Sequence, residues 1–182
     1  MIRIDIPATS ANLGSGFDSL GIALTMCNRV WMEEADELKI TTTDKIKVPT
    51  DETNLIYWAA RHLYQICGKT LPGLHIIQEN NIPMARGLGS SSACIVAGIL
   101  GANRMLGSPM SQSDLINLAA QIEGHPDNTS PAISGGLVAS AMEGKRVYSV
   151  SVPVSGKIAV RAQNGKSPRR AADGVFPRRH GV

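Results

Sequence analysis

The run Gly87-Leu88-Gly89-Ser90-Ser91-Ser92 is the part of this sequence whose residue types and spacing most clearly point to chemistry. Glycines let the backbone come close to a bulky anion and turn successive amides towards it. The apolar residues from Ala93 to Leu106 follow directly and predict a buried helix, whose positively polarised start would lie at the same place. Serine hydroxyls add donors, and one of them can ligate Mg²⁺. The run therefore predicts a cradle for a polyphosphate.

Two familiar phosphate-binding patterns do not fit this run. It has no Gly-Lys-Ser/Thr, so it is not a Walker A loop, and Ser92 stands where the dinucleotide-binding pattern needs its third glycine. On local chemistry alone, a glycine-rich turn with serine helix caps explains the residues as well as a phosphate site does.

A second polar group lies after the first predicted strand, where Asn12 and Asp18 stand in a stretch of small residues with glycines. A carboxylate and an amide near a phosphate site suit a substrate that carries an ammonium and a hydroxyl. Local turn chemistry is the other reading, because Asn and Asp side chains commonly bond to the backbone of their own turn. From these two residues alone, the turn is favoured.

A third polar group, Glu123, His125, Asp127 and Asn128, follows a predicted helix. Acids beside a phosphate cradle could hold Mg²⁺ or order the hydroxyl that accepts a phosphoryl group. The alternative is a polar turn at the end of a helix, which Pro126 supports. We interpret His125 as structural rather than as a general base.

Periodicity and cap signals predict the elements that must position these groups. Ile2, Ile4 and Ile6 alternate with charged residues as in a half-buried strand, which Pro7 should end, and residues 8–19 read as a loop. We expect further strands at 20–33, 37–43, 74–78, 136–142 and 147–152, and helices at 55–66, 93–106 and 112–123, the last opened by a capping box at Ser111.

Composition narrows the class of protein. Hydrophobic residues make up 43% of the 182 residues, enough for a sizeable core, and the longest apolar run, Ala93 to Ala102, is too short to span a bilayer. The start of the chain lacks the continuous apolar stretch of a signal peptide. Three widely spaced cysteines suit a reducing cytosol and form neither a zinc pattern nor a disulfide framework. We therefore expect a cytoplasmic protein without a membrane partner.

The charge is distributed unevenly along the chain. Residues 157–182 hold seven Lys or Arg and one acid, whereas the other 156 residues hold eleven bases and fourteen acids. The regular pattern also fades there, so we expect a domain at 1–156 and a basic tail at 157–182 that is disordered or encoded out of frame. A nucleic-acid-binding arm is the less favoured alternative, because no aromatic residues alternate with the arginines. We predict no nucleic-acid partner.

Three stretches in order carry a resemblance to a known family. Residues 83–93 resemble the signature of the superfamily named for galactokinase, homoserine kinase, mevalonate kinase and phosphomevalonate kinase (the GHMP kinases), in which this loop wraps the phosphates of ATP. Residues 7–21 and 123–128 resemble the homoserine kinases in particular. The likeness covers residues 1–156, and it implies an α+β fold of the ribosomal protein S5 domain 2-like type, with helices against a mixed or antiparallel sheet.

The resemblance also implies roles for individual residues. The metal would lie between Ser91 and Glu123, since Asn117 stands where some relatives have an acid. L-homoserine would contact Asn12, Asp18 and Asn128, and Asp127 and Asn128 would be catalytic. ATP would contact the following residues: Asn54 at the base, and Pro83, Arg86, Gly87, Leu88, Gly89, Ser90, Ser91 and Ser92 at the phosphates. For Asn54, which stands at the start of the helix predicted at 55–66, a helix cap is at least as good an interpretation.

The implied function is transfer of the γ-phosphoryl group of ATP to the hydroxyl of L-homoserine, a step of threonine biosynthesis, with Mg²⁺ as cofactor and a homodimer for the intact family member. Intact relatives continue into a second domain, which we find no match for, so we expect impaired activity. The alternatives are another kinase of the superfamily with a different alcohol substrate, and a non-enzymatic basic binding module.

Overall fold

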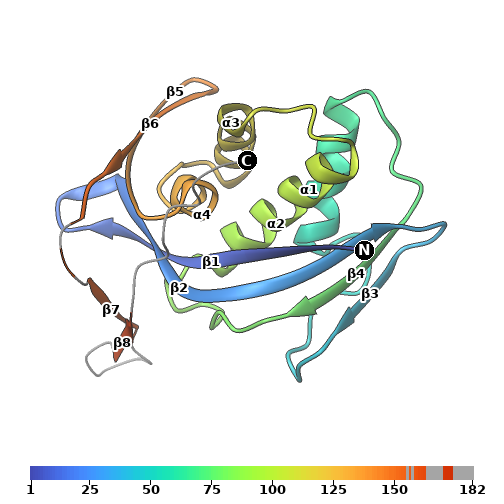
Figure 1. Cartoon of the computed structure of the whole chain (residues 1–182), viewed down its shortest axis with the longest axis horizontal. Coiled ribbons are helices and arrows are strands. Elements are labelled where there is room, and N and C mark those ends of the chain that lie inside the picture. Colours follow the sequence, from blue (N-terminus) through green and yellow to red (C-terminus); the bar gives the residue numbers. More distant parts are fainter. Residues whose placement is uncertain (155, 157, 163–169, 174–182) are drawn as a thin grey trace.

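The computed structural model describes residues 1–154, 156, 158–162 and 170–173. One sheet carries four helices on one of its faces (Figure 1). The strands of the sheet are β1 (Ile2–Leu13), β2 (Gly16–Glu34), β3 (Lys39–Thr42), β4 (Leu74–Glu79), β5 (Leu137–Glu143) and β6 (Arg146–Val152). The helices are α1 (Leu55–Ile66), α2 (Ser90–Met105), α3 (Gln112–Glu123) and α4 (Thr129–Ser134).

The long strand β2 organises the sheet. It pairs with β1 along most of its length, and its other edge pairs first with β5 and then with β4, so the order is β3-β4-β2-β5-β6 with β1 beside β2. The β3–β4 pair is parallel, which the long crossover through helix α1 makes possible, and the other pairs of this sheet are antiparallel. The predicted mixed α+β arrangement is therefore present.

Alternation along the strands explains which face the helices cover. Ile4 and Ile6 of β1, Met32 of β2, and Leu74 and Ile76 of β4 are buried in the core, whereas the residues between them face the other side of the sheet. In α2, an apolar helix of 16 residues, ten residues are buried, so this helix lies in the middle of the core.

The sequence-based prediction was wrong at the first turn of the chain. Pro7 does not end β1, and residues 8–19 are mostly strand, because β1 continues to Leu13 and β2 begins at Gly16. Proline is tolerated because, within the described ranges, β1 pairs with β2 alone, and the register is irregular between Pro7 and Thr9. The short helix α4, which contains Pro131, was not predicted at all.

Other predicted elements are confirmed within a few residues. Helix α1 follows its cap at Asn54, and Gly68 beyond its end has a positive φ of 67°. Helix α3 opens with the capping box of Ser111 and Asp114 and ends at Gly124. Helix α2 begins at Ser90, three residues before the predicted start at Ala93, so the serines belong to its first turn.

A two-stranded antiparallel sheet, formed by β7 (Ala159–Ala162) and β8 (Arg170–Asp173), lies within the segment for which we expected no strands. The expectation is therefore wrong at these residues. The other residues of 157–182, apart from 158, lie outside the described part of the chain, so the proposed division at residue 156 stays a prediction.

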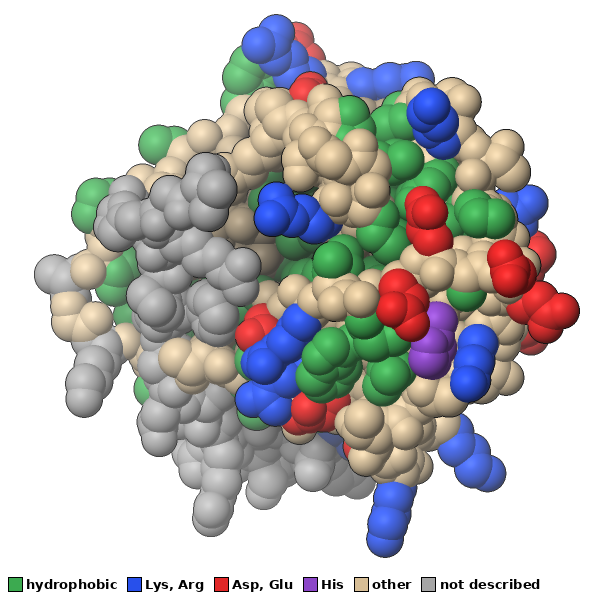
Figure 2. Space-filling view, turned by 45° about the vertical axis from the view of Figure 1, so that its right-hand side comes forward, with side chains coloured by type: hydrophobic (Ala, Val, Ile, Leu, Met, Phe, Trp, Pro, Cys, Tyr) green, Lys and Arg blue, Asp and Glu red, His purple; other side chains and the backbone are tan. Residues whose placement is uncertain are grey.

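The surface shown in Figure 2 carries Lys and Arg side chains interspersed with Asp and Glu, with hydrophobic side chains between them. No single basic patch stands out among the described residues on this face. Over the described part of the chain, none of the helices combines the length and the apolar character that a membrane crossing requires.

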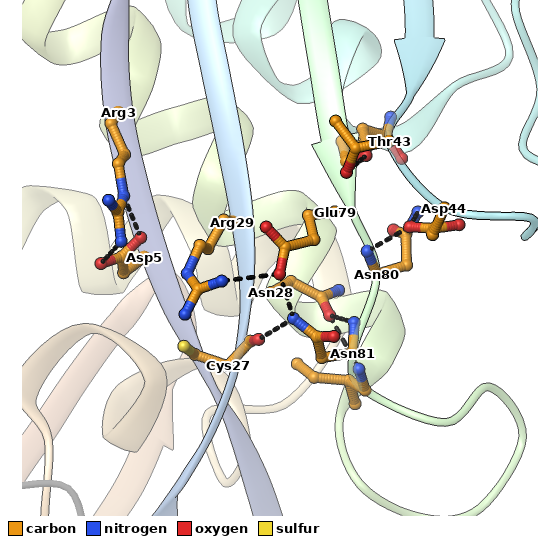
Figure 3. A network of polar contacts seen from close by, with 12 residues as sticks. Arg3, Asp5, Cys27, Asn28, Arg29, Thr43, Asp44, Glu79, Asn80 and Asn81 are labelled. Carbon is orange, nitrogen blue, oxygen red and sulfur yellow. Dashed lines mark hydrogen bonds and ion pairs between the residues drawn. The ribbon is translucent and has the colours of Figure 1, made fainter.

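Polar contacts at one end of the central strands fix the path of the chain towards residues 87–92, the glycine–serine loop (Figure 3). The side-chain oxygen of Asn28, which is buried, accepts hydrogen bonds from the backbone N–H groups of Asn81 and Ile82, both at 2.8 Å. Arg29 donates to Glu79 at 2.6 Å, and Asn80 donates to Asp44 through its backbone and its side chain. The chain thus leaves β4 in a defined direction towards Pro83.

Candidate nucleotide and substrate site

The glycine–serine loop reaches α2 in the conformation expected for an anion cradle. Gly87 and Gly89 have φ values of 66° and 64°, in the left-handed region that favours glycine. Gly89 is the N-cap of α2, and no side chain caps the helix there. The free N–H groups of the first turn, together with the helix dipole, make this end of α2 suited to a negatively charged ligand.

Gly89 also lies against Asn128 of the third predicted polar group and against Thr9 of β1. A Cβ atom at Gly89 would lie 2.0 Å from Oγ1 of Thr9 and 3.1 Å from Oδ1 of Asn128. Thr9 itself donates its hydroxyl to Oδ1 of Asn128 at 2.7 Å and its backbone N–H to the carbonyl of Leu88 at 3.1 Å. The structure therefore brings the loop, strand β1 and Asn128 together at one point.

Asp127 organises the residues beside Asn128. Its carboxylate is fully buried, and Oδ1 contacts Nδ1 of His125 at 2.6 Å and accepts from Nδ2 of Asn128 at 3.2 Å. Its Oδ2 is buried without a hydrogen-bond partner in the described part of the molecule. A Cβ at Gly21 would lie 1.7 Å from the carbonyl oxygen of Asp127, so only glycine lets β2 approach this closely.

Glu123 lies next to the start of α2. It accepts a hydrogen bond from the hydroxyl of Ser92 at 2.9 Å, and Ser92 is buried whereas Ser91 is exposed. Ser91 and Glu123 both line a cavity of about 440 Å³. Asn117 instead accepts a hydrogen bond from the backbone N–H of Val147 at 2.7 Å, so its side-chain oxygen is used to join α3 to β6.

A metal at this place would depend on few protein ligands. No cluster of three or more His, Cys, Asp or Glu residues suited to a metal occurs in the described ranges. Mg²⁺ fits such a site, because it keeps several waters and commonly takes only one or two carboxylates together with the phosphates of a substrate. Glu123 can supply the carboxylate and Ser91 a hydroxyl.

A second cavity, of about 300 Å³, lies beside Ser90 and Ser91. Asn54 lines it, but its side chain is already occupied: Oδ1 accepts from the N–H groups of Ile56 and Tyr57, and Nδ2 donates to the carbonyl of Pro49. The capping interpretation of Asn54 is therefore confirmed. Cys94 also lines this cavity, and burial, aided by the charge of Glu123, raises the pKa of its thiol to about 11.

Asn12 and Asp18 lie at the β1–β2 hairpin, and both side chains are exposed. Oδ1 of Asn12 accepts the backbone N–H of Asp18 at 2.9 Å, which is the turn chemistry favoured from the sequence. Both residues have positive φ, at 57° and 53°. The carboxylate of Asp18 makes no hydrogen bond of its own within the described residues.

The remaining residues predicted to contact the phosphates differ in exposure and in their hydrogen bonds. Pro83 and Arg86 are exposed, and Arg86 donates to the carbonyl of Ala85. Leu88 is buried and contributes its carbonyl to the contact with Thr9. Sequence reasoning missed Thr9 altogether, although it stands inside the stretch 7–21 that carries the family likeness.

Comparisons with known proteins agree with this geometry. Residues 54–136 match the profile of the GHMP kinases N terminal domain. The chain is 45% identical over 157 residues to the homoserine kinase of Clostridium botulinum (strain 657 / Type Ba4), an alignment that covers 85% of this chain and 52% of that protein. The chain thus spans about half the length of the curated relatives that it matches.

Solved structures give the same result. A Listeria monocytogenes protein assigned as a homoserine kinase is 40% identical, with a TM-score of 0.74 over 85% of this chain and 55% of that one. The mevalonate kinase of Methanococcus jannaschii shares the fold alone, at 15% identity and a TM-score of 0.64 over 84% of this chain and 56% of that one. The fold class expected from the sequence is confirmed.

Proposed function

We propose that this chain, which carries the amino-terminal domain of the GHMP kinases, contributes the ATP site and part of the acceptor site of a kinase that phosphorylates the hydroxyl of L-homoserine. One observation carries the proposal: the uncapped start of α2 contacts both Thr9 and Asn128, so an anion cradle and a polar acceptor group adjoin each other.

The cradle would hold the phosphates of ATP through the backbone amides at Gly87 to Gly89 and the first turn of α2. The exposed hydroxyl of Ser91 is available to a ligand, whereas that of Ser92 is donated to Glu123. Mg²⁺ held by Ser91 and Glu123 would neutralise phosphate charge when it is bound. The cavity of about 300 Å³ beside Ser90 would take the nucleoside.

The acceptor would lie on the side of Asn128. Hydrogen bonds to Asp127 and Thr9 fix the side-chain amide of Asn128. The amide would therefore face a substrate hydroxyl in one defined orientation. The carboxylate of Asp18, which has no hydrogen-bond partner among the described residues, would bind the ammonium of homoserine, with Asn12 holding the turn that presents it. Phosphoryl transfer depends mainly on positioning and charge stabilisation, so these residues need not include a general base.

Binding measurements on the 182-residue chain test the proposal. We expect ATP with Mg²⁺ to bind, and L-homoserine to bind in the presence of nucleotide. Asp18→Asn should weaken homoserine binding about tenfold to hundredfold, because a hydrogen bond to a charged group contributes roughly 1.5–3 kcal/mol, and should leave ATP binding unchanged. Asp36→Asn, at another exposed aspartate, is the control and should change neither affinity.

A different alcohol substrate is the main competing function, since the same fold occurs in a mevalonate kinase. Titrating L-homoserine beside mevalonate and other small alcohols would separate the two. If ATP bound but homoserine did not, the substrate assignment would be wrong while the nucleotide site remained. The three free cysteines suit a reducing compartment, so we place this enzyme in the cytoplasm.

A further inference from the structure

Gln78 is an unusual residue for its place in the sheet. It lies on the helix-covered side of β4, where the two preceding inward residues, Leu74 and Ile76, are fully buried and apolar. Gln78 is only 2% exposed, and its Nε2 is buried without a hydrogen-bond partner in the described part of the molecule. An unpaired amide donor in a core costs free energy that an apolar side chain at this position would avoid.

The same side chain lines the cavity of about 300 Å³ beside the start of α2. Three side-chain amides line this cavity, those of Asn54, Gln78 and Asn80. Asn54 uses both ends of its amide within the protein, and Asn80 donates its Nδ2 to Asp44. Asn54 and Asn80 thus each have one amide N–H committed to the protein, whereas neither N–H of Gln78 Nε2 has a partner in the described part of the molecule.

We infer that Gln78 reads the nucleobase, by donating a hydrogen bond from Nε2 to an acceptor on the edge of the base. The inference rests on the proposed function, because it takes the cavity as the nucleoside site. An amide has a donor and an acceptor side by side, and adenine presents a ring nitrogen acceptor next to its exocyclic amine, so the two groups pair well. Gln78 is therefore a specificity residue for the nucleotide.

The position of the cavity supports this assignment. Ser90 and Ser91, which open α2, line one side of it, so a nucleotide with its phosphates on the cradle would extend its base into the cavity. Leu55 and Met84 provide apolar lining for the faces of the base, as is usual in ligand sites where a few polar groups fix orientation.

The experiment measures dissociation constants of the 182-residue chain for ATP and for 1-deaza-, 3-deaza- and 7-deaza-ATP, each of which lacks one ring acceptor. We expect one analogue to bind the natural chain about tenfold more weakly than ATP, which is about 1.4 kcal/mol. In Gln78→Leu, ATP should bind about tenfold more weakly, and the difference between ATP and that analogue should vanish. Gln65→Leu, at an exposed glutamine of α1, is the matched control and should behave as the natural chain.

A thermal melt without nucleotide separates recognition from folding. Gln78→Leu should melt at the same temperature as the natural chain or higher, because it removes an unpaired buried donor. Equal affinity of the natural chain for ATP and all three analogues would overturn the inference without any variant. Unchanged ATP affinity in Gln78→Leu would also overturn it and leave the proposed nucleotide site intact. No binding of ATP by the natural chain would instead overturn the proposed function.

Discussion

Two glycines of the phosphate loop provide a matched test of how the site is built. Gly87 and Gly89 have nearly the same left-handed φ, so alanine at either position carries about the same backbone strain, roughly 1–2 kcal/mol. Their surroundings differ. A Cβ at Gly87 would meet no atom within 4 Å, whereas a Cβ at Gly89 would lie 2.0 Å from Oγ1 of Thr9.

Gly89→Ala should therefore cost more than Gly87→Ala. Overpacking adds about 1–3 kcal/mol, and displacing Thr9 breaks its hydrogen bond to Asn128, which adds about 1 kcal/mol. We expect Gly87→Ala to lower the free energy of unfolding by about 1–2 kcal/mol and Gly89→Ala by about 3–6 kcal/mol. Urea unfolding, followed by tryptophan fluorescence and circular dichroism, measures both.

Adding Thr9→Ala to Gly89→Ala tests the assigned contact directly. The nearest atom, Oγ1 of Thr9, is then absent, so the double variant should be about 1–2 kcal/mol more stable than the sum of the two single changes predicts. If Gly87→Ala and Gly89→Ala cost the same, or if the two changes at 9 and 89 were additive, the close contact between the loop and β1 would not exist and the reasoning would be refuted.

Three further predictions concern the surroundings of the site. Asn54→Ala should destabilise the chain by about 1–2 kcal/mol through loss of the α1 cap, and Asn54→Ser, which keeps a capping oxygen and brings no carboxylate against the carbonyl of Pro49, should cost less in the same unfolding assay. Cys94, whose pKa is about 11, should be alkylated by iodoacetamide at pH 8 far more slowly than Cys67. The rate at Cys94 should still rise above pH 10, and it should fall when ATP is added, because Cys94 lines the cavity of about 300 Å³. Mass spectrometry measures both rates, and equal rates at pH 8 would contradict the assigned burial. Hydrogen bonds from Ser111 lower the pKa of Asp114, so Ser111→Ala should destabilise at neutral pH without affecting ATP binding. The difference should shrink as the pH falls from the usual pKa of an aspartate through the lowered pKa of Asp114, and the part due to the lost cap bond to the Asp114 N–H should remain.

Local chemistry made part of the fold predictable. Helix caps lie at Asn54, Ser111 and Gly124, where each residue helps to satisfy backbone groups within its own turn. Such caps can be predicted from the neighbouring residues alone. The glycines and serines of residues 87–92 similarly predicted the start of α2 to within a few residues, because a glycine directly before an apolar stretch is typical of the turn that precedes a helix.

The rest of the fold depends on partners that are distant in sequence. Thr9 and Ser10 are small and polar, so the residues around them read as a loop, yet both are buried in β1 because β2 pairs with the strand. Gln78 looked like an ordinary strand residue, since nothing in the neighbouring sequence shows that its Nε2 lacks a partner among the described residues. Buried polar residues in strands are thus the part of a site that sequence patterns reveal least.

The contacts around α2 imply that the nucleotide and acceptor sides form one unit. Thr9 bonds to the loop at Leu88 and to Asn128, and Ser92 bonds to Glu123, so two independent links join the start of α2 to residues 123–128. Neither link uses a flexible surface side chain, since Thr9 and Ser92 are both buried. A ligand that orders the loop would therefore also order Asn128. On this basis ATP and the acceptor should bind with positive coupling, and by linkage each should raise the affinity of the other by the same factor.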